Sequence, residues 1–186
     1  MRWLLFIILA YICVLAQTTL GNLVSIQWEF AGAIMPDLLA ILAVFIALNV
    51  RASSDVVISC WVLGLAIDLT VSGGPGAITA VGPMAIAYSA GGFLVFKVRD
   101  VFFRDKPSSQ MILAIVFCLI AHGLWVIMQS IITARYTTFG MFGRMLLQAL
   151  LLSLYTAVFA SPIYTLLNRY GRWIIATGSL RTGRER

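Results

Sequence analysis

Ionisable and amide side chains interrupt three otherwise apolar stretches of this 186-residue chain. Asp68 lies in GLAIDLTVSGGPGA (64–77), Asp37 lies in AGAIMPDLL (31–39), and the single histidine lies in CLIAHGLWV (118–126). Carboxylates and an imidazole are groups that transfer protons or bind ligands. Seven residues after the histidine, an amide falls on the same helical face. The candidate residues for a polar pocket are therefore Asp37, Asp68, His122 and Gln129.

No catalytic signature accompanies these groups. The sequence around His122 contains no G-x-S-x-G, HExxH or paired-carboxylate motif. Cys13, Cys60 and Cys118 stand singly in separate apolar stretches without CxxC spacing, so neither a zinc site nor a disulfide framework is indicated. The glycine-rich turn at 72–76 lacks the Lys-Ser/Thr ending of a phosphate-binding loop. We therefore expect no catalytic residue, no cofactor and no metal site.

The elements that carry the candidate residues are too apolar for a soluble domain. Hydrophobic residues make up 61% of the chain and charged residues 11%, whereas soluble domains are about half apolar and a quarter charged. Six runs approach the roughly 20 residues that cross a bilayer, namely 3–20, 33–50, 55–72, 76–96, 109–133 and 145–168. Backbone groups in lipid must be satisfied internally, as in helices. The sequence predicts an all-α integral membrane protein, a six-transmembrane-helix bundle over 1–168 with a basic tail at 169–186.

The placement of basic residues predicts the orientation of this bundle. If the N-terminus is cytoplasmic, the outer segments contain only Arg135 and Arg144 of the 13 basic residues, as the positive-inside rule expects. Both termini are then cytoplasmic, and the tail can bind anionic lipid. The net charge of +6 thus has a membrane explanation and does not indicate nucleic-acid binding. The first run also has the basic start of a secretory signal, but five further runs favour its retention as a helix.

Helix geometry places three of the candidates in the outer half of the membrane. Asp68 lies about four residues, or roughly 6 Å, from the outer end of its span. His122 lies about 13 residues, or roughly 20 Å, from the inner end of its span, beyond the midplane of a core about 30 Å thick. Asp37 opens its span at the outer face, and Pro36 suits a first helical turn. The simplest interpretation of Asp37 is a helix-start residue.

Asp68 has two interpretations that the sequence leaves open. A carboxylate near the bilayer centre costs on the order of 2.5–3.5 kcal/mol, so such residues usually face the bundle interior. In the first interpretation, Asp68 bonds to the turn at 72–76 or to a neighbouring helix. In the second, it belongs to an outward-facing polar pocket shared with His122 or Asp37.

Small residues mark candidate helix-packing positions. Gly82 and Pro83 lie in the middle of the run 76–96 and predict a kink there. The run 145–168 carries small residues at strict four-residue spacing, which lets helices approach closely in lipid. This stripe could face another helix of the chain, the default interpretation, or the helix of a partner. The candidate packing residues are Gly64, Gly82, Pro83, Ala149, Ser153, Ala157 and Ser161.

Over roughly 3–170 the chain resembles the rod shape-determining protein MreD family, and the motifs that carry the resemblance lie within about 35–90. The resemblance rests on MPDLLAILAVFIAL (35–48), GLAIDLTVSGGPGAITAV (64–81) and IAY (86–88). The family pattern has a proline opening the second main span, a mid-helix aromatic, Gly-x-x-x-Asp-Leu, a short glycine turn with Gly-Ala, and Ala-Tyr. The matching residues are Pro36, Phe45, Gly64, Asp68, Leu69, Gly76, Ala77, Ala87 and Tyr88, with Phe45 standing where tyrosine is common.

This resemblance implies a non-enzymatic scaffold subunit of the machinery that elongates rod-shaped bacteria, located in the cytoplasmic (inner) membrane. It implies as partners an MreC-like bitopic protein, a RodA-like glycosyltransferase, a class B penicillin-binding protein and an MreB-like actin cytoskeleton. The inner loop 97–107 and the helix faces would bind them. The family fold is similar to the substrate-binding S-components of energy-coupling-factor transporters, so a small-molecule-binding transporter subunit is the alternative. Ala10 and Ala16 lack the Ala-x-x-x-Ala spacing of many S-components, which favours the scaffold.

Overall fold

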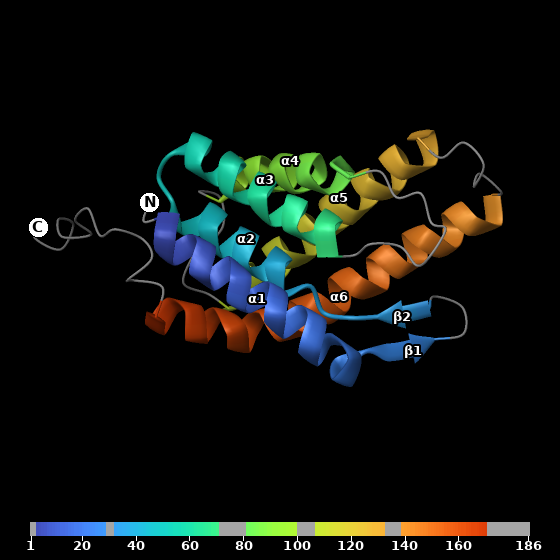
Figure 1. The fold of residues 1–186 in the computed structure, drawn as a ribbon, viewed down its shortest axis with the longest axis horizontal. Coiled ribbons are helices and arrows are strands. Elements are labelled where there is room, and N and C mark those ends of the chain that lie inside the picture. Colours follow the sequence, from blue (N-terminus) through green and yellow to red (C-terminus); the bar gives the residue numbers. More distant parts are fainter. Residues whose placement is uncertain (1–2, 29–31, 71–80, 100–106, 133–138, 171–186) are drawn as a thin grey trace, which may run out of the picture.

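The computed structural model describes residues 3–28, 32–70, 81–99, 107–132 and 139–170. Within these ranges the chain is helical apart from one short β-hairpin, and the predicted all-α class is confirmed (Figure 1). The hairpin is antiparallel, with Gln27 opposite Ala33. The elements are α1 (Trp3–Val24), β1 (Ile26–Trp28), β2 (Gly32–Ile34), α2 (Leu38–Asn49), α3 (Ser53–Thr70), α4 (Pro83–Val98), α5 (Pro107–Ile132) and α6 (Phe139–Tyr170).

Three helical segments are long and apolar enough to cross a membrane: Ser53–Thr70, Ser109–Ile132 and Phe142–Leu167. Three further apolar helical segments are shorter: Trp3–Thr19, Leu38–Asn49 and Pro83–Val98. Large apolar side chains also lie exposed along the outer helices, for example Tyr11 on α1 and Val158 on α6. Exposed apolar area on this scale is rare in soluble monomers. These features indicate a membrane protein.

Two predicted helix starts are wrong. The run 33–50 is not one helix, because β2 occupies its beginning and α2 starts only at Leu38. Pro36 therefore precedes the helix and is not part of its first turn. The predicted kink at Gly82 and Pro83 is also wrong, because Pro83 is the first residue of α4. Proline is favoured at this position, where its missing N–H has no helical partner, and Gly82 supplies a φ of 121° just before it.

Helix α2 is the centre of the bundle. Its residues from Leu39 to Leu48 are all buried, and it contacts each of the other five described helices. Figure 1 shows it between α1 and α6 on one side and α3, α4 and α5 on the other. A helix that is apolar on every face has no side to turn to water and is enclosed by its neighbours. Its 12 residues extend about 18 Å at 1.5 Å per residue.

The C-terminal end of α2 is bound by Arg99 at the end of α4. The buried Arg99 guanidinium donates from Nη1 to the carbonyl of Ala47 at 3.0 Å and also to that of Val50. Its Cζ lies 4.0 Å from the centroid of the Phe96 ring. A cation at the C-terminus of a helix meets the negative end of the helix dipole and pairs with carbonyls that have no helical partner. This contact connects the end of α4 to the C-terminal end of α2.

The small-residue stripe of α6 packs within the chain. Ala149, Ser153 and Ala157 are buried and Ser161 is partly buried. Helix α6 contacts α5 and α2. The burial of Ala149, Ser153 and Ala157 agrees with the default interpretation of the stripe, packing against the chain's own helices.

Helices α3 and α4 approach each other closely at glycines. A Cβ added to Gly64 would lie 2.5 Å from the carbonyl oxygen of Met84 and 2.7 Å from Cα of Ala85. A Cβ added to Gly92 would lie 2.3 Å from Sγ of Cys60. Real Cβ atoms do not come this close to backbone atoms. The identity of Gly64 is thus fixed by the spacing between the two helices.

We expect Gly64→Ala to destabilise the protein because the new methyl group would push α4 away from α3. Overpacking of this kind costs about 1–3 kcal/mol. Thermal unfolding in mild detergent measures the effect. The matched control is Gly123→Ala on α5, where an added Cβ meets no atom within 4 Å. Equal melting temperatures for both variants would contradict the close approach.

Candidate functional site

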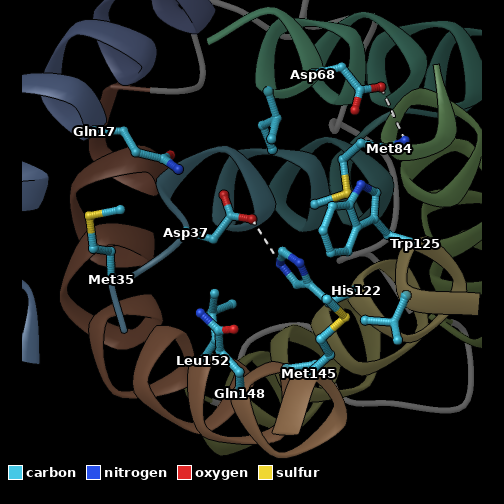
Figure 2. Close-up of a pocket in the computed structure, with 13 residues that line it drawn as sticks. Gln17, Met35, Asp37, Asp68, Met84, His122, Trp125, Met145, Gln148 and Leu152 are labelled. Carbon is cyan, nitrogen blue, oxygen red and sulfur yellow. Dashed lines mark hydrogen bonds and ion pairs between the residues drawn. The ribbon is translucent and has the colours of Figure 1, made fainter. Parts of the chain in front are cut away.

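A cavity of about 270 Å³ lies inside the bundle at the end where α2 begins (Figure 2). Five polar side chains line it, and they come from five different helices or helix starts. Its walls also include a tryptophan and three methionines. The lining residues are Gln17, Asp37, Asp68, His122 and Gln148, together with Met35, Ile67, Met84, Trp125, Val126, Met145, Ala149 and Leu152.

The carboxylate of Asp37 joins three helices. Asp37 is 3% exposed and is the N-cap of α2, with Oδ1 accepting from the Ala40 amide at 3.0 Å. Its Oδ2 accepts from the Tyr88 hydroxyl of α4 and lies 3.2 Å from Nε2 of His122 on α5. The backbone amide of Asp37 also donates to Oγ1 of Thr156 on α6, at 3.0 Å. One residue therefore bonds α2 to α4, α5 and α6.

These partners replace the water that a buried carboxylate loses. An ionised carboxylate only accepts hydrogen bonds, so the pair with His122 requires a proton on Nε2. Burial of an unpaired charge is costly, whereas a charge with several well-placed donors is tolerated. Asp37 has a backbone amide, a hydroxyl and an imidazole as donors. The arrangement is a satisfied buried polar cluster.

Asp68 binds the start of the neighbouring helix. Its Oδ2 accepts from the amides of Gly82 at 2.9 Å, Met84 at 3.1 Å and Ala85 at 3.3 Å. The first amides of a helix lack helical acceptors, and the positive end of the helix dipole favours an anion there. The side chain of α3 thus caps α4 across the intervening segment. The turn at 72–76, the other partner considered for Asp68, lies outside the described residues.

The structure brings three of the four candidate pocket residues to one cavity. Asp37 and His122 are in direct contact, and Asp68 lines the same cavity from the α3 side (Figure 2). The two interpretations of Asp68 are therefore compatible, because it both binds a neighbouring helix and faces the pocket. Gln129 is not among the residues that line the cavity. Among the described residues, no group of three or more His, Cys, Asp or Glu side chains could hold a metal ion.

Sequence reasoning missed several residues of the site. Gln17 and Gln148 are amides within apolar runs, the same signal that selected Gln129, and they line the cavity. Tyr88 was selected only as part of the family pattern and not as a pocket residue, and Thr156 carries no comparable signal. A tyrosine or threonine in an apolar helix packs in many ways, and only the tertiary arrangement places these two hydroxyls beside Asp37.

Comparisons of the chain with known protein families, with curated proteins and with solved structures found no match. The function is therefore inferred from the residues and their geometry.

We expect the effects of substituting Asp37 and Tyr88 on the free energy of unfolding to be strongly coupled. Hydrogen bonds to charged groups contribute about 1.5–3 kcal/mol, so a double-mutant cycle of Asp37→Asn and Tyr88→Phe should give a coupling energy of this order. Reversible unfolding in detergent measures it. The control pairs Asp37→Asn with Tyr155→Phe, whose hydroxyl donates to the carbonyl of Val24, and this pair should be additive. Additivity in both cycles would contradict the contact.

We expect Asp68→Asn to keep the cap of α4 and Asp68→Leu to lose it. The asparagine oxygen can still accept from the amides of α4, whereas leucine leaves them without an acceptor, at a cost of about 1–3 kcal/mol. Melting temperatures of the two variants measure the difference. An equal loss in both would show that the charge, and not the hydrogen bonding, holds α4.

Proposed function

We propose that this chain is an MreD-like scaffold subunit of the bacterial cell-elongation complex, which supports cell shape and lateral peptidoglycan synthesis without chemistry of its own. One observation carries the proposal. Three residues of the MreD-like pattern, Gly64, Asp68 and Tyr88, hold α2, α3 and α4 together. Proteins that share one arrangement of helices are expected to share the residues that hold those helices together.

Four of the nine matching residues, Phe45, Gly64, Asp68 and Tyr88, have contacts that account for their types. Gly64 allows the close approach of α3 to α4, and Asp68 caps α4. Tyr88 donates to the buried Asp37. The fully enclosed ring of Phe45 packs at 6.0 Å between centroids against Tyr164 of α6. Of the other matching residues, 76 and 77 lie outside the described ranges.

The proposal includes a six-span topology with cytoplasmic ends. The charge distribution supports it, with only Arg135 and Arg144 among the 13 basic residues on the outer side. The beginning of α1 and the end of α6 also lie at the same end of the bundle (Figure 1). The short helix α2 is compatible with a spanning position, because irregular backbone at membrane depth is tolerated where protein encloses it.

In this scaffold, the outer helix faces contact the spans of partner proteins. The proposed partners are an MreC-like bitopic protein, a RodA-like glycosyltransferase with its class B penicillin-binding protein, and an MreB-like actin, reached directly or through the others. The most exposed apolar face belongs to α1, where Leu4, Ile7 and Tyr11 are all more than half exposed. Helix association in lipid depends on packing surfaces such as this face of α1.

The proposal also assigns a role to the basic tail, 169–186, which would bind anionic lipid.

A transporter subunit similar to the S-components is the second candidate. The cavity favours it, because a cavity of about 270 Å³ with several polar lining groups has the character of a small-molecule site.

Co-purification distinguishes the two candidates. The tagged protein is extracted gently from native membranes, and its partners are identified by mass spectrometry against an unrelated tagged membrane protein. The scaffold predicts enrichment of an MreC-like protein together with the rod synthase. Recovery of an ATPase pair with a coupling subunit would contradict it.

Site-specific photo-crosslinking sharpens this test. A photoreactive residue at Ile12 on α1 or Leu150 on α6 lies on an exposed face, whereas one at Val44 of α2 is enclosed. The scaffold predicts crosslinks to the MreC-like protein from an exposed position and none from the position of Val44.

A further inference from the structure

We propose that the cavity is a binding site for a small organic cation, an ammonium group carrying an apolar or aromatic substituent. This inference does not depend on the scaffold function. It rests on the charge, the hydrogen-bonding capacity and the shape of the cavity lining.

The charge of the lining favours a cation. Two carboxylates, Asp37 and Asp68, and one imidazole, His122, are its ionisable groups, and no lysine or arginine is among the lining residues that the structure describes. The imidazole is engaged by Asp37 at 3.2 Å. A carboxylate or phosphate ligand would thus face Asp68 with no free cationic partner. The same arrangement disfavours a free amino acid as the ligand, because the carboxylate of the amino acid would also need a cationic partner.

Two acceptor oxygens of the cavity lining, on Asp68 and on Gln17, have no hydrogen-bond partner among the described residues. Asp68 uses Oδ2 for three amides of α4, and among the described residues its Oδ1 accepts no hydrogen bond. Gln17 also directs its amide group into the site beside Asp37 (Figure 2). The buried Oε1 of this amide has no partner among the described residues. Asp37, in contrast, is already satisfied by Ala40, Tyr88 and His122. An ammonium group supplies donors only, so it complements Asp68 directly.

The rest of the lining suits an apolar substituent. Figure 2 shows Trp125 and Met84 between Asp68 and His122, so that a ligand bound at Asp68 would meet the indole and the thioether. An aromatic face attracts a cation within about 6 Å. Methionine side chains adapt to irregular ligands, and three of them line the cavity. The geometry therefore assigns the ammonium to Asp68 and its substituent to the Trp125 side.

Three probes that share a phenylethyl group and differ in its charged or neutral substituent test this assignment on the purified protein. They are 2-phenylethylammonium, the neutral 2-phenylethanol and the anionic 3-phenylpropanoate, titrated in mild detergent by calorimetry. We expect saturable binding of the ammonium, weaker binding of the alcohol and none of the propanoate. No saturable binding of the ammonium, or equal binding of either other probe, would overturn the proposal.

Single substitutions test whether Asp68 is the residue that binds the ammonium group. In Asp68→Asn the amide oxygen can keep the cap of α4 and the NH₂ group replaces the free acceptor, so ammonium affinity should fall about tenfold or more. The control is Asp55→Asn in the first turn of the same helix, with unchanged affinity. A melting temperature for Asp68→Asn near that of the wild type separates lost binding from lost folding. If Asp68→Asn is folded and binds as the wild type does, the assignment is wrong. Because no partner protein is present, this result is independent of the scaffold test.

Discussion

The buried carboxylate of Asp37 is the constraint on which the arrangement of the helices depends. A charge removed from water must be surrounded by donors in good geometry, since otherwise its desolvation outweighs the attraction between the paired groups. Here the donors come from separate elements: the first turn of α2, Tyr88 of α4 and His122 of α5. Displacement of any of these helices would leave the charge unsatisfied. Apolar contacts enclose α2, but they do not by themselves fix its position along the bundle, whereas this cluster does.

Helix α4 holds α2 in position because side chains of α4 and of its C-cap contact both ends of α2. Tyr88 contacts the N-cap of α2, and Arg99 contacts its last carbonyls. The position of α4 depends in turn on α3, through the cap by Asp68 and the close contact at Gly64. The contacts therefore form a continuous chain from α3 through α4 to α2. The polar cavity beside Asp68 lies among the helices that these contacts hold in place.

The sequence predicts the helical class and the grouping of Asp37, Asp68 and His122, because helix geometry alone gives the depth of each residue along its span. It does not predict where α2 and α4 begin. An apolar run has the same composition whether it is helical or extended, and a Gly-Pro pair can kink a helix or start one. The hydrogen bonds of Tyr88 and Thr156 to Asp37 could not be predicted either, because the partner of a hydroxyl depends on which helix packs against it. Burial of the Ala149–Ala157 face was the default expectation, because small residues at four-residue spacing require a close neighbour.

The most direct test of the central role of Asp37 is nuclear magnetic resonance of the imidazole, because His122 is the only histidine of the chain. Protein labelled with ¹⁵N-histidine gives signals from this one ring. The account predicts a proton on Nε2 that exchanges slowly with water and whose resonance shifts in Asp37→Asn but not in Asp55→Asn. A ring that exchanges rapidly with solvent and is unchanged by Asp37→Asn would contradict it, because Asp37 would then not hold α5 through His122.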